Sequence, residues 1–364
     1  MRFIRLLNRS FAAVLRPASC AGLFLAFSIS AGVFGETPRT YENRLTPIKD
    51  PKPLLADYPE WVEPVRETHR FEAPVLVNDE NGDLSVRAWR FSYNLRGIVE
   101  IPNRLLAKET AVIMVHPWGT DDGQGWSTPE PAGAADFCTP EKNHAAGLHT
   151  RTVISPFLQS LRGKVGFVMY SLPANEDPIR KKLYRSFRHK PTDAERAQGE
   201  KEMKVKLNSF SYRGEELPGT LKLSSDKPVV DYFKQFKGLD AGDRFDPKGF
   251  WDLPIPLTVD VKADPDDVMI YDGEGYPALR TFLQAHGIRH ILLTGYCTDM
   301  CYAKTCAGFD NLSQDFNVFL VGDATLATYP AHTTPRFATS VHISSASIEH
   351  LITQISWIKY EPRK

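Results

Sequence analysis

An excess of charge of either sign is the first thing that this sequence lacks. Its 364 residues include 44 lysines and arginines and 44 aspartates and glutamates. Four of the arginines stand in the first 35 residues, where there is no acid, so the remainder carries 40 bases (44 less 4) against 44 acids. A nucleic-acid-binding protein shows a clustered basic surface instead. We therefore expect no nucleic-acid partner.

Signatures of cofactor and metal binding are also missing. The chain has no GxGxxG fingerprint, no phosphate-binding loop, no heptad pattern and no internal repeat. Only five cysteines occur, and Cys297, Cys301 and Cys306 follow a C-x3-C-x4-C spacing, whereas common zinc sites use C-x2-C. The sequence predicts no cofactor.

Residues 1–35 have the pattern of an export signal. A basic start leads into a mostly apolar run, Ala21–Phe34, and small residues precede Glu36. The run is shorter than the ~20 residues that usually span a membrane. We expect an exported protein, periplasmic or secreted, without a stable membrane span after signal removal; an N-terminal membrane anchor is the alternative. Disulfides form in an oxidising compartment, and the sequence leaves open whether Cys138 and Cys306 pair.

The next segment, residues 36–108, divides into two parts. Residues 36–66 are rich in proline and charge, which is typical of an extended linker. Residues 68–104 contain short, partly alternating apolar runs separated by turn residues, which predict a small antiparallel β extension.

Residues 109–364 follow the pattern of an α/β domain with a charged insertion at about 174–250. Apolar runs predict buried strands, and amphipathic stretches between them predict helices. Together these elements predict a doubly wound, mostly parallel sheet of about six strands with helices on both faces, which is a Rossmann-like three-layer sandwich. The expected strands are 111–115, 165–169, 268–271, 291–294, 318–321 and 340–343. The expected helices are 145–162, 194–206, 276–286 and 345–358.

One strand-to-helix turn contains the residues that indicate a reactive site. The apolar run at Ile291 leads into Thr294-Gly295-Tyr296-Cys297-Thr298-Asp299-Met300-Cys301, and open α/β sheets bind ligands where strands end. A thiol in the first turn of the following helix faces the positive helix end, which favours the nucleophilic thiolate.

This stretch resembles the isochorismatase-like cysteine hydrolases. That family carries an apolar strand, then Gly-x-x-Thr-Asp-x-Cys, a helix, and a strand that ends near Asp-Ala. The matching residues are Gly295, Thr298, Asp299, Cys301, Asp323 and Ala324. The resemblance implies that Cys301 is the nucleophile. It also implies a cis peptide bond between Tyr296 and Cys297, with the backbone N–H groups of Cys297 and Cys301 pointing at a developing oxyanion.

The rest of the family's usual catalytic set is altered. His116 stands where the family has an aspartate, and Asp272, or Tyr271 with a one-residue slip, stands where it has a lysine. One interpretation is a rebuilt triad of Cys301, His116 and Asp272, in which imidazole takes the thiol proton and carboxylate orients the imidazole. The other is a binding protein whose catalytic set has decayed. Both positions have changed, and the new residues, a histidine and an aspartate, are the types that activate a thiol. This joint change favours the rebuilt triad.

Aromatic and metal-binding residues need separate treatment. Trp118, Trp126 and Tyr276 are candidates to line the substrate pocket, although aromatics near strand ends also serve as core packing. Related amidases of the nicotinamide type carry an Asp-x-His motif and a further histidine after the second strand. Residues 170–177 of this chain contain no histidine, so we expect no metal.

The leading hypothesis is an exported cysteine hydrolase that cleaves a small amide or related C–N bond, or a vinyl ether, through a Cys301 thioester in the amide case. A catalytically inactive binding protein is the first alternative. An α/β-hydrolase with a Cys297 nucleophile is the second, in which Asp323 and His332 complete the triad. The expected partner is a small-molecule substrate, and the sequence leaves open whether copies of the chain pair as a homo-oligomer.

Overall fold

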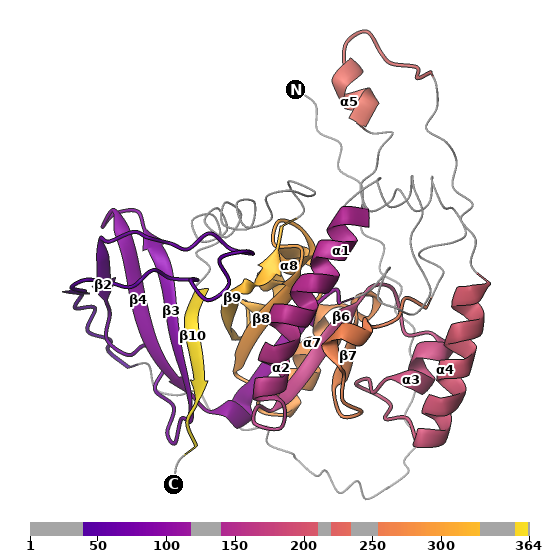
Figure 1. The fold of residues 1–364 in the computed structure, drawn as a ribbon, viewed down its shortest axis with the longest axis horizontal. Helices are drawn as coiled ribbons and strands as arrows, with labels where there is room; N and C mark the ends of the chain where they lie inside the picture. Colours follow the sequence, from indigo (N-terminus) through magenta and orange to yellow (C-terminus); the bar gives the residue numbers. More distant parts are fainter. Residues whose placement is uncertain (1–38, 118–139, 210–219, 234–253, 328–353, 363–364) are drawn as a thin grey trace, which may run out of the picture. The chain divides into compact units, whose positions relative to one another are not determined.

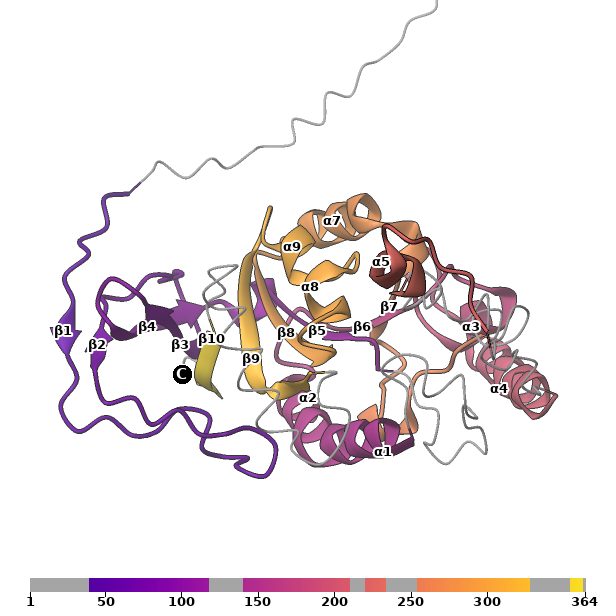
Figure 2. The same ribbon diagram turned by 90° about the horizontal axis from the view of Figure 1, so that it is seen from above.

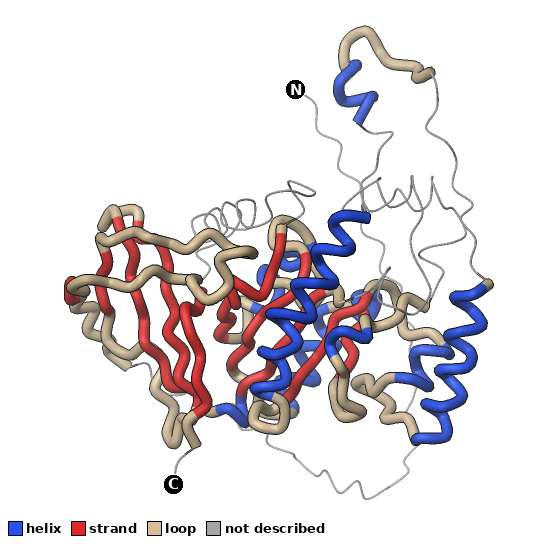
Figure 3. The backbone as a smooth tube through the Cα atoms, viewed as in Figure 1, coloured by secondary structure: helices blue, strands red, loops and turns tan. Residues whose placement is uncertain are grey.

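The computed structural model describes residues 39–117, 140–209, 220–233, 254–327 and 354–362. Strands form a single ten-stranded sheet in the order β1-β2-β4-β3-β10-β9-β8-β5-β6-β7 among these residues (Figures 1 and 3). The strands are β1 Thr46–Pro47, β2 Arg70–Glu72, β3 Leu84–Ser92, β4 Gly97–Leu105, β5 Thr110–Val115, β6 Phe167–Leu172, β7 Val268–Tyr271, β8 His290–Tyr296, β9 Asn317–Leu326 and β10 Gln354–Tyr360.

The parallel part of this sheet is the doubly wound sheet that the sequence predicts. Strands β9, β8, β5, β6 and β7 are neighbours in that order, and each adjacent pair is parallel. Every residue of β5 and β7 is buried, which accounts for the apolar runs 111–115 and 268–270 within them. With β10, which is parallel to β9, this part contains six strands. The predicted fold class is confirmed.

Helices cover both faces of the parallel strands. In Figure 2, α1 and α2 lie on one face, and α7, α8 and α9 lie on the other. The helices are α1 Pro140–His149, a π-helical turn Thr150–Ile154, α2 Ser155–Leu161, α3 Pro178–Leu183, α4 Asp193–Asn208, α5 Pro228–Phe233, α7 Tyr276–Ala285, α8 Cys301–Lys304 and α9 Phe309–Leu312. Two apolar clusters fill the core, and each contains residues of β5 and β8.

The N-terminal β extension continues the main sheet. Strands β3 and β4 form the expected antiparallel pair, and β2 adds to β4 in parallel. The connection to the parallel strands runs through β10, which pairs antiparallel with β3 and parallel with β9. The extension therefore shares its backbone hydrogen bonding with the domain that carries Cys301.

One element differs from the expectation. Residues 345–358 are predicted as a closing helix, but 354–358 belong to strand β10. The reason is that β10 fills the gap between β3 and β9, where both edges offer backbone hydrogen bonds. The rest of that predicted helix, and the predicted strand 340–343, lie outside the described residues.

The charged segment 174–250 contains the helix expected around 194–206. It is α4, and it begins with a capping box in which Thr192 accepts a hydrogen bond from the Glu195 backbone and the Glu195 carboxylate accepts one from the Thr192 backbone. Its last turn buries Leu207.

Within the described ranges, no helix combines the length and apolar character that a membrane span requires. Residues 1–35, where the export signal is expected, are outside these ranges.

Candidate active site

The site lies where four parallel strands end. Register pairs Val115 of β5 with Gly295 of β8 and with Ser171 of β6, and pairs Leu172 of β6 with Tyr271 of β7. The residues that follow these positions come together at the carboxyl edge of the sheet, where α/β proteins bind ligands. This geometry brings His116 and Asp272 together from different strands.

His116 is fixed by its backbone and by its ring. Its φ of 51° is in the left-handed region, which a non-glycine residue adopts rarely. The backbone N–H donates to the Ser171 carbonyl at 2.9 Å. The buried ring places Nε2 2.6 Å from Oδ2 of Asp272. Because a carboxylate only accepts hydrogen bonds, Nε2 carries the proton that it donates to Asp272. Nδ1 then keeps its lone pair and is the nitrogen suited to act as a base.

Asp272 accepts hydrogen bonds from three side chains. Besides His116, the Ser171 hydroxyl donates to Oδ1 at 2.8 Å and the Cys306 thiol donates to Oδ1 at 3.3 Å. Burial alone would raise the pKa of this carboxyl, but the hydrogen bonds and the charge of His116 outweigh it and lower the pKa. Asp272 is therefore a carboxylate at neutral pH.

Cys301 is the first residue of α8 and is a buried free thiol. Burial raises its pKa to about 12, and the charge of Asp272 is among the smaller contributions in the same direction. The expectation of a thiolate in the resting protein is therefore wrong. The physical reason is that α8 has only four residues, so its dipole is small, while apolar surroundings penalise the charged form.

The turn between β8 and α8 has the unusual backbone that the resemblance implies. The peptide bond between Tyr296 and Cys297 is cis. Gly295 has a φ of +105°, and a Cβ there would lie 2.2 Å from the Val115 carbonyl oxygen, so only glycine fits. The Tyr296 hydroxyl donates to the Ala146 carbonyl at 3.0 Å and lies 2.8 Å from Nδ1 of His149, which ties the turn to α1.

Of the three predicted pocket residues, the structure describes Tyr276. Tyr276 begins α7, and its hydroxyl donates to the Asp315 carboxylate at 2.6 Å. Its ring packs against the core. Trp118 and Trp126 lie outside the described residues. Their roles as pocket residues stay predictions.

Ser171 and Cys306 are the residues that sequence reasoning missed. Ser171 had a signal, because it stands near the end of a predicted strand whose carboxyl edge meets those of its neighbours. The sequence gives Cys306 no role in the site, but its thiol is free and hydrogen-bonded to Asp272. Cys138 lies outside the described residues.

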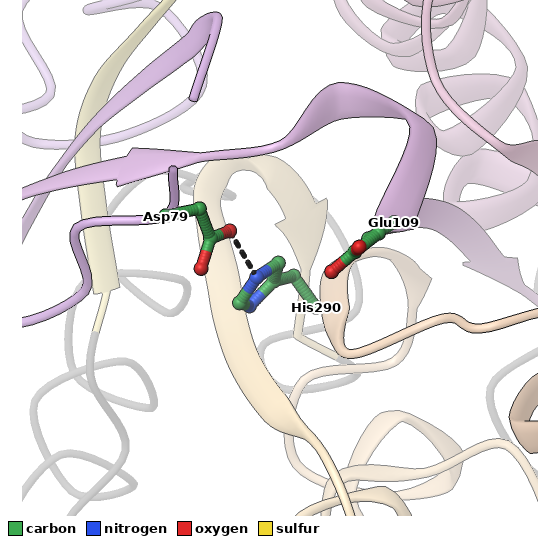
Figure 4. Close-up of side chains that lie close together, drawn as sticks. All are labelled: Asp79, Glu109 and His290. Carbon is green, nitrogen blue, oxygen red and sulfur yellow. Dashed lines mark hydrogen bonds and ion pairs between the residues drawn. The ribbon is translucent and has the colours of Figure 1, made fainter. Parts of the chain in front are cut away.

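One further cluster has residue types that bind metals. Asp79, Glu109 and His290 offer ligand atoms within 4.8 Å of one another (Figure 4). The positive charge there comes from Arg289, whose Nη1 lies 3.1 Å from Asp79 and 2.9 Å from Glu109. Nε2 of His290 lies 2.8 Å from Asp79, while Asn317 donates to its Nδ1 at 3.1 Å. This cluster fits an ion-pair network, because its donors already satisfy the carboxylates.

Comparison with known proteins gives one family match. The family model described as "Isochorismatase domain" matches residues 187–341, which include Cys301 and Asp272 but not His116. This match confirms the resemblance to isochorismatase-like hydrolases. No curated protein matches the chain.

Similar solved structures include a cysteine hydrolase from Pseudomonas syringae pv. phaseolicola, at 17% identity and a TM-score of 0.33, covering 67% of this chain and 86% of that one. Nicotinamidase PncA from Bacillus subtilis has 14% identity and a TM-score of 0.31, over 68% of this chain and 98% of that one. Pyrazinamidase of Pyrococcus horikoshii in complex with zinc has 14% identity and a TM-score of 0.32, over 68% of this chain and 99% of that one.

Proposed function

We propose that this protein is an exported cysteine hydrolase that cleaves a small amide or related C–N bond, with Cys301 as nucleophile, His116 as general base and Asp272 as the group that orients the imidazole. The observation that carries the proposal is the 2.6 Å contact between His116 Nε2 and Asp272, at the sheet edge that also holds Cys301. The imidazole base and the carboxylate that orients it are hydrogen-bonded to each other, as thiol activation requires.

The first half-reaction forms a thioester. Nδ1 of His116 takes the proton of the Cys301 thiol as sulfur attacks the substrate carbonyl carbon, so the high pKa of the resting thiol is overcome only during the reaction. The backbone N–H groups of Cys297 and Cys301 are proposed to hold the oxyanion. The imidazolium then gives its proton to the leaving amine, and the C–N bond breaks.

The second half-reaction consumes water. His116 removes a proton from a water molecule, which attacks the thioester carbonyl. The C–S bond then breaks, the sulfur regains a proton from the imidazolium, and a carboxylic acid leaves. The carboxylate of Asp272 stabilises the imidazolium in both halves, and the hydrogen bonds from Ser171 and Cys306 hold that carboxylate in place.

The test is a screen of the purified protein against small amides, followed by replacement of the nucleophile. We expect Cys301→Ala to lower turnover by about 10⁴-fold or more, because the covalent route is lost, while the melting temperature and circular dichroism stay close to those of the original protein. Undiminished turnover in this variant would remove Cys301 from the mechanism.

An inactive binding protein is the second candidate, because a thiol pKa of about 12 is also what a structural buried cysteine shows. Mapping the adduct of a thiol-reactive substrate analogue separates the candidates. An adduct on Cys301 that forms more slowly in His116→Ala supports the proposed triad. An adduct on Cys297 supports the α/β-hydrolase alternative, and no adduct on either residue supports the binding protein.

Export is proposed from residues 1–35 alone. Expression of the full chain in a bacterial host, followed by fractionation and N-terminal sequencing, tests it. We expect a periplasmic or secreted product that begins near Glu36. An unprocessed chain in the membrane fraction would indicate the N-terminal anchor instead.

A further inference from the structure

A cavity of about 320 Å³ lies between helix α2 and strands β9 and β10. Its lining includes Asp57, Tyr58, Phe157, Asp323 and Trp357, but none of the three proposed catalytic residues. The cavity is therefore separate from the site around Cys301.

The described walls of the cavity carry negative charge. Two carboxylates, Asp57 and Asp323, line it, and none of the described residues that line it is a lysine or an arginine. In the described part of the chain, neither carboxylate forms an ion pair with a basic side chain. Burial raises the pKa of Asp323 to about 6, and the charge of Asp57 adds to the shift. Burial and then the charges of Asp323, Asp57 and Glu60 raise the pKa of Tyr58.

The charged form of Asp323 destabilises the folded protein. A partly buried charge without a basic partner opposes folding, so a site that retains one often uses it for binding. The residue is also positioned well, because its backbone carbonyl accepts a hydrogen bond from His149 Nε2 at 2.7 Å.

The remaining walls indicate the type of ligand. Tyr58, Phe157 and Trp357 contribute aromatic rings, and the Trp357 side chain is 47% exposed although it is large and apolar. Aromatic faces attract organic cations, whereas a divalent metal ion requires a shell of several oxygen ligands. Two carboxylates and three rings therefore fit an organic ammonium group better than a metal ion.

We propose that this cavity binds a small organic amine as a cation, with its ammonium group paired to Asp323 and Asp57 and its apolar part against Phe157 and Trp357. A volume of about 320 Å³ is sufficient for a ligand with one ring and a short chain. The proposal does not depend on the reaction at Cys301.

Isothermal titration calorimetry with 2-phenylethylamine at pH 7.5 tests the proposal, in both the original protein and the Cys301→Ala variant. We expect one amine to bind each chain in both proteins. The uncharged analogue 2-phenylethanol should bind about tenfold more weakly or not at all, because it cannot pair with the carboxylates.

Three variants locate the binding site. Asp323→Asn and Asp57→Asn should each weaken amine binding about tenfold or more, and Asp226→Asn, at an exposed position elsewhere, should leave it unchanged. Asp57 is exposed, so its replacement tests the site without any change in a buried residue. Equal binding of amine and alcohol, no binding of the amine, or unchanged affinity in both carboxylate variants would overturn the proposal.

Discussion

At the scale of single residues, Asp272 determines how the candidate active site is charged. It accepts from His116, Ser171 and Cys306, so its carboxylate is stabilised although it is largely buried. Cys301 has the opposite environment, since burial keeps its thiol protonated. The account therefore requires a neutral thiol that loses its proton only as it attacks.

The reactivity of Cys301 should show this high pKa directly. We expect the rate of alkylation by iodoacetamide to keep rising above pH 9, because the thiolate fraction of a group with a pKa of about 12 increases throughout that range. Peptide mass spectrometry separates Cys301 from Cys297 and Cys306. A rate at Cys301 that levels off below pH 8 would show instead that the resting protein holds a thiolate.

Asp323 should make stability depend on pH. Its pKa in the folded protein, about 6, is above the usual value, so the folded state binds the proton more tightly than the unfolded state does. Stability from this group is present at low pH and is lost as the pH rises from about 4 through about 6. Asp323→Asn should therefore raise the free energy of unfolding by about 1–3 kcal/mol at pH 8 and by much less at pH 4.5.

Chemical denaturation at the two pH values measures the difference, with Asp226→Asn as the control at an exposed site. A stability gain for Asp323→Asn that is the same at both pH values would contradict the pKa shift.

At the scale of elements, the turn after β8 shows why one glycine is required. Gly295 combines a positive φ with close approach of the Val115 backbone, since β8 and β5 are neighbours. The buried strands themselves were predictable, because runs such as 111–115 and 291–293 are apolar throughout. Strand β10 was not predictable from its local sequence, because its two partners come from distant parts of the chain.

Gly295→Ala should destabilise the fold strongly. The added methyl group would meet the Val115 backbone at 2.2 Å, and the strand cannot move without disturbing its neighbours. We expect a loss of about 3 kcal/mol or more. Gly163→Ala is the matched control, because Gly163 also has a positive φ but has no atom within 4 Å of the added position. It should cost only about 1 kcal/mol. Similar melting temperatures for the two variants would contradict this account of the turn.

At the scale of the whole molecule, one sheet joins the N-terminal strands to the parallel strands that position the candidate site. The contact between His116 and Asp272 was predictable because both residues follow buried parallel strands, whose carboxyl ends meet at one edge. The hydrogen bond from Cys306 was not, because it depends on how the segment after α8 meets the segment after β7. Sequence pattern indicates strand ends, whereas tertiary packing decides which side chains lie around them.

The most direct test of the central claim is the mass of the peptide that contains Cys301 after an acid quench during turnover of a small amide. The account predicts an increase equal to the acyl group of the substrate, located on the sulfur of Cys301, and its loss in Cys301→Ala. Continued turnover with the acyl group on Cys297, or with no acylated cysteine, would contradict it.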